Sequence, residues 1–125
     1  MAWSLALCWL YAITKYRYVP NLEEILFAVD DAKRLGFQYM ELEGVGSQLY
    51  TVAKNKSTIK KRCEANGVKL IDFVPVLPDI MSPDPQKRRR ALKDFQLGCE
   101  LGAYFETGMV QADTCLLYTS PSPRD

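Results

Sequence analysis

The fold is decided by one short stretch, residues 35–44, which reads Leu-Gly-Phe-Gln-Tyr-Met-Glu-Leu-Glu-Gly. Gly36 follows an amphipathic helical run, at the position past a helix end where a left-handed backbone favours a residue without a Cβ. Residues 37–43 then alternate with a period of two, which is typical of a β-strand. The stretch therefore predicts the end of a helix followed directly by a strand.

The same unit recurs along the chain. Gly36, Gly67 and Gly102 each follow a run with helical spacing and precede an apolar run. Strand, helix and strand in this order form a βαβ unit, whose strands are parallel. The predicted strands are residues 4–10, 37–43, 68–74 and 103–110, and the predicted helices are residues 21–35, 47–66 and 83–101.

Local signals sharpen two of these boundaries. Asn21 is expected to cap the helix that it opens, and Glu24 completes a capping box. Four prolines fall within residues 75–85, so neither a helix nor a central strand is expected to run through that segment. We therefore predict a stiff loop there.

Repeated βαβ units build either a doubly wound open sheet or a (β/α)8 barrel. No G-x-G-x-x-G follows the first predicted strand, so the dinucleotide-binding open sheet lacks its main signature. In a barrel, the strand face that meets the helices is apolar and the opposite face lines the interior. Met40 and Leu42 mark the helix side of their strand, so Tyr39, Glu41 and Glu43 are predicted to face inward.

The same reasoning places two further acids inside, Asp72 between Ile71 and Phe73, and Glu106 on the fourth strand. Catalytic residues of such barrels lie at the carboxyl ends of the strands, and buried carboxylates are costly unless paired, metal-bound or protonated. Glu43 and Glu41 are therefore candidate catalytic residues, with Glu43 the better placed, and Asp72 and Glu106 are candidates for substrate binding. The alternative for Glu41, Asp72 and Glu106 is a structural role beside polar side chains of neighbouring strands.

Two aromatic residues and one basic run are further candidates for ligand contacts. Trp9 and Tyr11 would end the first strand over the same mouth, where aromatic faces commonly wall a sugar site, although simple rim packing is the alternative. Residues 87–90 form a basic run, Lys-Arg-Arg-Arg. Because this run falls early in an outer helix, we expect a solvated face rather than a nucleic-acid site.

Composition narrows the function further. The 125 residues are 48% hydrophobic and 25% charged with a net charge of +1, which favours neither nucleic acid nor an anionic membrane as partner. Histidine is absent, which excludes a Ser-His-Asp triad or a Cys-His pair within this chain. The four cysteines form no C-x-x-C pair, so no zinc site is expected. With no clear secretory signal, we expect a cytoplasmic protein with reduced, mostly buried thiols.

A family resemblance rests on residues 4–9, 21–24 and 32–43, with support from residues 66–70 and 99–103. These segments resemble the sugar phosphate isomerase/epimerase family of xylose-isomerase-like TIM barrels, over about residues 3–110. The resemblance implies an α/β fold, an incomplete (β/α)8 TIM barrel with about the first four strands and three helices. Only Glu41 and Glu43 match a family position near the substrate mouth.

The resemblance also implies a chemistry. Members of the family typically bind a divalent metal (Mg²⁺, Mn²⁺, Co²⁺ or Zn²⁺) through later strands and interconvert sugars through an enediolate. A full barrel needs about 250 residues. We therefore expect residues 1–114 to be the amino-terminal half of such an enzyme, inactive alone, with no metal bound by this part. The expected partner is a small-molecule sugar or sugar phosphate.

Two alternatives share the fold. One is the amino-terminal part of an endonuclease-IV-like apurinic DNA repair enzyme, which the absence of histidine weakens. The other is a non-catalytic fragment. Residues 115–125 fit neither, because they lack a helical or strand period and resemble the translation of a transposon-type sequencing adapter. They are expected to be a non-native or disordered tail.

Overall fold

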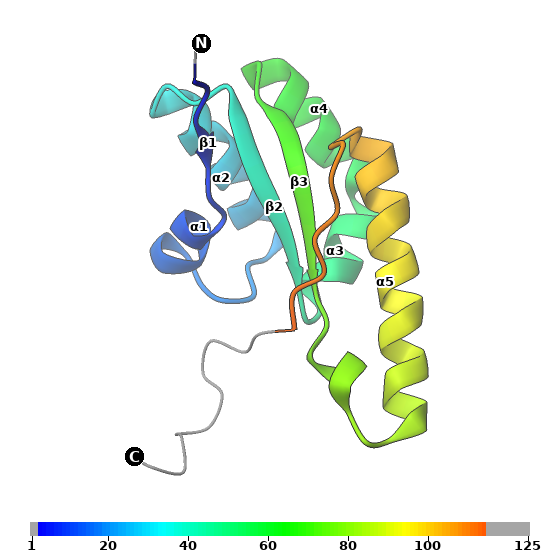
Figure 1. Ribbon diagram of the computed structural model, residues 1–125. Coiled ribbons are helices and arrows are strands. Elements are labelled where there is room, and N and C mark those ends of the chain that lie inside the picture. The colour runs from blue at the N-terminus through cyan, green and yellow to red at the C-terminus, as the bar shows by residue number, and fades with distance from the viewer. Residues whose placement is uncertain (1–2, 115–125) are drawn as a thin grey trace.

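The computed structural model describes residues 3–114, so the predicted tail at residues 115–125 lies outside the described residues. Within the described range, the strands form a parallel sheet in the order β1-β2-β3, with helices in the connections (Figure 1). This is the α/β class that the sequence predicts. The elements in chain order are β1 (Ala6–Leu7), α1 (Leu10–Lys15), α2 (Leu22–Arg34), β2 (Tyr39–Val45), α3 (Gln48–Lys54), α4 (Lys56–Asn66), β3 (Lys69–Val76), the 3₁₀ helix η1 (Pro78–Met81) and α5 (Pro85–Phe105).

Helix α2 begins and ends as the sequence predicts. The Asn21 side chain accepts a hydrogen bond from the backbone N–H of Glu24 at 2.9 Å, and the Glu24 carboxylate accepts one from the backbone N–H of Asn21 at 3.0 Å. Gly36 follows the last turn with a φ of +89°. Because L side chains rarely adopt this backbone conformation, a glycine is required where the helix ends.

Helix α1 is fixed to α2 by one carboxylate. Asp31 Oδ2 accepts hydrogen bonds from Tyr11 Oη at 3.1 Å, Tyr16 Oη at 2.6 Å and Lys15 Nζ at 2.8 Å. Arg34 Nη2 donates to Asp31 Oδ1 at 3.2 Å. Burial alone would raise the pKa of Asp31, but these donors stabilise the ionised form and lower its pKa to about 2.

Strand β2 has the two faces that the sequence predicts. Met40 and Leu42 are each 1% exposed and belong to the hydrophobic core beneath the helices. Tyr39, Glu41 and Glu43 are half-buried and alternate with them, so they lie on the other face. The core itself is built from side chains of β2, β3 and all of the α-helices, among them Ala12, Ile25, Val29, Leu49, Val52, Ile59, Phe73, Leu101 and Phe105.

Strand β3 departs from strict alternation through a β-bulge. Met40 pairs with Leu70, but the next residue, Glu41, pairs with Asp72, so Ile71 is the extra residue. The bulge lets Leu70 and Phe73 both enter the core while Asp72 lies opposite Glu41. The regular alternation expected for a strand at residues 68–74 is therefore wrong around Ile71, although Asp72 still lies on the same sheet face as Glu41.

The first strand is shorter than predicted. Residues 4–10 were expected to be extended, but β1 comprises only Ala6–Leu7, and Trp9 is already the N-cap of α1. The Trp9 carbonyl accepts the first helical hydrogen bonds, from the N–H groups of Ala12 and Ile13. An apolar run of this kind fits a buried strand and a buried helix equally well, which explains the error.

The predicted second helix is two helices. Asn55 both ends α3 and precedes α4, with a backbone outside the helical region (φ −119°, ψ 22°). Its side-chain Nδ2 donates to the Thr51 carbonyl at 2.8 Å, and the same carbonyl also accepts the backbone N–H of Asn55 at 3.1 Å. Helix α4 then ends at Gly67, whose φ is +64°, as predicted.

Strand β3 continues through Pro75, contrary to the prediction of a loop from that residue. Phe73 and Leu77 donate backbone hydrogen bonds to the segment at residues 109–113, whereas Pro75 only accepts one, from the N–H of Asp113 at 3.0 Å. The proline is tolerated because this edge of the sheet loses a single donor there. The rest of the predicted loop contains η1.

The fourth strand and the preceding helix are shifted relative to the prediction. Helix α5 extends to Phe105, past Gly102, and residues 109–113 then run parallel to β3 through the bridges Phe73↔Val110 and Val76↔Asp113. A Cβ on Gly102 would collide with Cγ2 of Val110. Gly102 therefore permits close packing inside the helix and does not end it.

One further expectation concerns the cysteines. Cys63 is buried, but Cys8 and Cys99 are exposed, so the prediction of mostly buried thiols is wrong for the described cysteines. Cys99 lies on the solvent side of α5, because the buried side of that helix contains Gly98 and Gly102. Within residues 3–114, no helix combines the length and the apolar character needed to cross a membrane.

Candidate functional site

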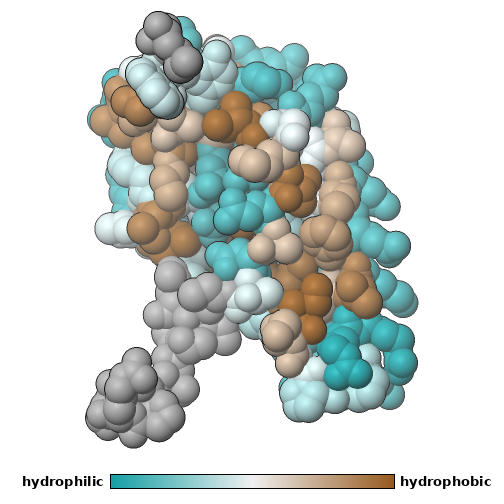
Figure 2. All heavy atoms as spheres, viewed as in Figure 1, coloured by the Kyte–Doolittle hydropathy of each residue, from teal (hydrophilic) through white to brown (hydrophobic). Residues whose placement is uncertain are grey.

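An acid face covers the side of the sheet opposite the core. It consists of Glu41 and Glu43 on β2, Asp72 on β3 and Asp113 in the parallel segment beyond β3. Figure 2, drawn in the view of Figure 1, shows hydrophilic side chains over the middle of the strands with apolar side chains around them. Parallel pairing brings these acids together, because residues on one face of adjacent strands lie side by side.

Glu41 is tied to the end of the first strand. Its Oε1 accepts a hydrogen bond from the backbone N–H of Trp9 at 3.1 Å and a weaker one from Cys8 Sγ at 3.6 Å. Burial raises the pKa of the Cys8 thiol, and the neighbouring carboxylates of Glu41 and Glu43 contribute. Glu41 therefore has a structural role as well as a place on the acid face.

Asp72 is the most deeply buried of these acids, with 4% of the residue exposed. Its Oδ1 is buried and has no hydrogen-bond partner among the described residues. Burial raises the pKa of Asp72, and the charge of Glu41 across the strand pair raises it further.

Glu43 lies nearest the carboxyl end of β2 among the carboxylates of that strand. Burial raises its pKa to about 7, and repulsion from Glu41, Asp113 and Asp72 adds to the effect. A carboxyl group with this pKa takes up and releases a proton at neutral pH. Its position and its raised pKa both make Glu43 the best candidate for proton transfer on the acid face.

The other predicted site residues do not join this face. Tyr11 lies in α1 and bonds Asp31, so the prediction that it ends the first strand is wrong. Trp9 is 1% exposed and packs in the core, with a buried indole N–H that has no partner among the described residues. Trp9 is thus a core side chain and does not line an open binding site.

Glu106 was predicted on the inner face of a fourth strand, and this is wrong. It is the exposed C-cap of α5 in a left-handed conformation, with a φ of +55°. Its carbonyl accepts a hydrogen bond from Nζ of Lys69, the first residue of β3, at 3.0 Å. Glu106 therefore lies at the amino end of the strands, away from Glu43.

Two residues of this region were missed. Asp113 takes the place expected for Glu106, because the chain returns to the sheet only after the turn at Gly108 (φ +78°). Gln48 is fully buried at the start of α3, where its Oε1 accepts the N–H of Val45 and its Nε2 has no partner among the described residues. The glycine at 108 was the one available signal for a later strand start.

Two further predictions concern cations. Residues 87–90 lie exposed in the first turns of α5, as expected of a solvated face. Within residues 3–114, no group of three or more histidine, cysteine, aspartate and glutamate side chains is placed to hold a metal ion.

Comparisons with protein-family models, curated proteins and solved structures give no match to this chain.

Proposed function

We propose that this chain is the amino-terminal half of a (β/α)8-barrel isomerase or epimerase that acts on a sugar or sugar phosphate through an enediolate. The observation that carries the proposal is the position of Glu43, on the face of a parallel sheet that carries no helices, near the carboxyl end of its strand. Active sites of barrel enzymes lie at that end of the strands. The resemblance of residues 32–43 to this enzyme family supports the same assignment.

Glu43 would move the proton. Its ionised carboxylate removes a proton from the carbon next to the sugar carbonyl, and the electron pair of that C–H bond forms the enediolate double bond. The electron pair of the carbonyl double bond moves onto its oxygen. In an isomerase, the protonated Glu43 then returns the proton to the former carbonyl carbon, while the neighbouring hydroxyl proton passes to that oxygen and a new carbonyl forms. In an epimerase, an acid on the other face returns a proton to the original carbon and the first carbonyl forms again. A pKa near 7 suits both directions, because neither protonation state is strongly favoured at neutral pH.

Glu41 and Asp72 would act on Glu43 rather than on the substrate. Repulsion from the carboxylates of Glu41 and Asp72 adds to the effect of burial and raises the pKa of Glu43. The pKa of Asp72 is itself raised by burial and by Glu41. We assign no step to a metal, because the described residues do not supply a metal site. The divalent metal of the complete enzyme would need ligands from other strands, and the half barrel alone is expected to be inactive.

The decisive experiment uses the complete enzyme and compares Glu43→Gln with Glu64→Gln. Glu64 lies exposed on α4, in the helical layer, so its replacement is the matched control. Glu43→Gln should lower kcat by about 10²–10⁴-fold with little change in KM, and should abolish the rise of kcat with pH near 7. Wild-type activity in Glu43→Gln, or sugar isomerisation by the 125-residue chain alone, would contradict the proposal.

Reading the gene past residue 114 separates the proposal from DNA repair. Further strands that each bring one glutamate, aspartate or histidine are expected for the isomerase. Many histidines and a basic groove would instead indicate the apurinic endonuclease.

A further inference from the structure

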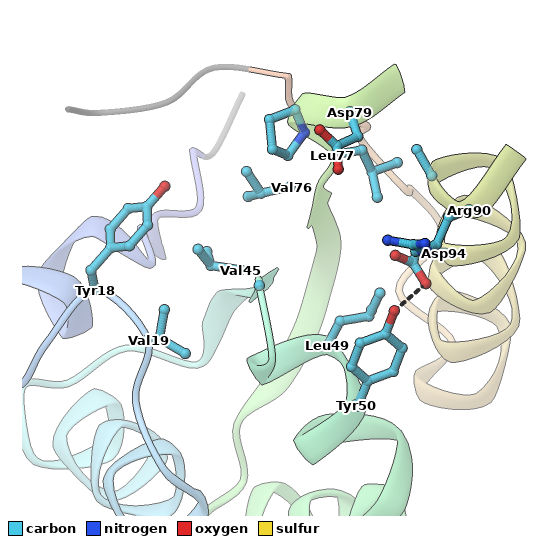
Figure 3. A pocket seen from close by; sticks show the side chains of 13 residues that line it. Tyr18, Val19, Val45, Leu49, Tyr50, Val76, Leu77, Asp79, Arg90 and Asp94 are labelled. Atoms are coloured by element: carbon cyan, nitrogen blue, oxygen red, sulfur yellow. Dashed lines mark hydrogen bonds between the residues drawn. The ribbon is translucent and has the colours of Figure 1, made fainter. Parts of the chain in front are cut away.

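A cavity lies beyond the ends of β2 and β3. It is a cavity of about 300 Å³ whose floor contains Val45 and Val76, the last residues of these strands (Figure 3). Leu49 of α3 and Leu77 extend the apolar surface, and Val19 of the α1–α2 connection faces them across the opening. None of Glu41, Glu43 and Asp72 lines this cavity, so it is separate from the acid face.

One side of the cavity is polar. Tyr50 Oη donates a hydrogen bond to Asp94 Oδ1 at 2.5 Å, which holds the Asp94 carboxylate at the edge of the opening (Figure 3). This hydrogen bond is the main reason that the pKa of Tyr50 is raised to about 12, so the phenol stays a donor. Asp79 of η1 and Arg90 of α5 complete this side.

The charges of this side do not cancel. The cavity is lined by two carboxylates, Asp79 and Asp94, and by a single guanidinium, that of Arg90. Neither carboxylate forms an ion pair among the described residues. A cationic group on a ligand could therefore pair with a carboxylate that has no cationic partner. The apolar floor would at the same time bury a hydrocarbon body, as in small-molecule sites generally.

We propose that this cavity binds a small organic cation, an ammonium group on an aromatic or branched aliphatic body. The ammonium group lies between Asp79 and Asp94, and the hydrocarbon body lies against Val45, Leu49 and Val76. A phosphate would meet two carboxylates, and a polyhydroxylated sugar would leave hydroxyl groups unpaired against the apolar floor. The site stands on its own residues and does not depend on the proposed isomerase activity.

Three probes with the same aromatic ring test the charge preference. Phenethylamine, 2-phenylethanol and phenylacetate differ in bearing a cation, a neutral hydroxyl and an anion. We expect the dissociation constants, measured by NMR titration of the 125-residue chain, to increase in that order, with about tenfold between amine and alcohol. Equal binding of all three, tightest binding of phenylacetate, or no binding of the amine overturns the proposal.

Variants locate the site. Val19→Trp should fill the opening and weaken phenethylamine at least tenfold, whereas Leu92→Trp, on an exposed position of α5 outside the cavity, should leave binding unchanged. Asp94→Asn should reduce the amine preference while the amide oxygen still accepts from Tyr50, with exposed Glu100→Gln as its control. Circular dichroism checks folding of each variant, and full amine affinity in folded Val19→Trp and Asp94→Asn contradicts the site.

Discussion

Asp72 lies directly opposite Glu41 in the β2–β3 pair, although a strict alternation of β3 would have grouped Asp72 with Leu70. The bulge at Ile71 creates this carboxylate pair on adjacent strands. Like charges directly opposite in a sheet are destabilising, and burial of Asp72 adds to the cost. The pair therefore makes stability depend on the ionisation of the acid face.

The ionisation of Glu43 should lower the stability of the fold. Its pKa is raised to about 7 in the folded chain, above the ordinary value near 4.5 of the unfolded chain. The folded state thus binds the proton more tightly, and the free energy of unfolding should fall as pH rises from about 4.5 to about 7. Because water still reaches part of the side chain, we expect a loss of about 1–2 kcal/mol.

Urea unfolding followed by circular dichroism between pH 4.5 and 8 measures this effect. Glu43→Gln should flatten the dependence over that range, while Glu64→Gln should retain it. A free energy of unfolding that rises through this range in the wild type, with the same slope in Glu43→Gln, contradicts the assignment.

Replacement of Asp72 by asparagine should stabilise the chain at pH 7. The amide removes the charge that opposes Glu41, and its NH₂ group can donate to the Glu41 carboxylate across the strand pair. We expect the free energy of unfolding to increase by about 1 kcal/mol. In a Glu41→Gln background the gain should shrink, and an equal gain in both backgrounds would show that the two carboxylates are not coupled.

Loss of Asp31 should destabilise the fold through α1. Asp31→Ala leaves two tyrosine hydroxyls, Lys15 and Arg34 without their shared acceptor, so we expect a loss of about 2–4 kcal/mol in urea unfolding. Because the folded pKa of Asp31 is lowered to about 2, its contribution should be present above pH 4 and disappear as pH falls toward 2.

The matched control for Asp31 is Glu23→Ala, an exposed acid in the first turn of α2. It should change the free energy of unfolding by less than about 1 kcal/mol. If Asp31→Ala has the small effect of Glu23→Ala, the hydrogen bonds around Asp31 do not hold α1 in place.

Replacement of Gly102 by alanine should destabilise the chain by steric overlap. The new Cβ would collide with Cγ2 of Val110 although alanine favours the helix, so we expect a net loss of about 1–3 kcal/mol. Val110→Ala removes the colliding methyl group, and the double variant should therefore lose less than the sum of the single variants. Strict additivity in thermal or urea unfolding would place the cost of Gly102→Ala elsewhere.

Signals that lie within one segment predicted the structure well. The capping box at Asn21, the left-handed glycines at 36 and 67 and the two faces of β2 each depend on neighbours a few residues away, and each is present. The placement of Glu41 and Glu43 on the sheet face opposite the core followed from the same local alternation. This much of the candidate site could be found without coordinates.

Features that depend on distant partners could not be found in this way. The bulge at Ile71 is defined by the pairing of β3 with β2, and the close contact of Gly102 by Val110 in the following segment. Asp113 takes the place predicted for Glu106, because the end of α5 is set by this packing. The cavity around Asp94 joins four separate parts of the chain, none of which carries a recognisable motif.

The extra residue at Ile71 has a consequence for how this chain is compared with other βαβ proteins. An alignment that runs through β3 without a gap can match either Leu70 or Asp72 to the correct face, but not both. Residues on one side of Ile71 are then assigned to the wrong face. Sequence profiles of this strand should therefore be split at Ile71, with the part from Asp72 onward aligned to the carboxyl half of β2.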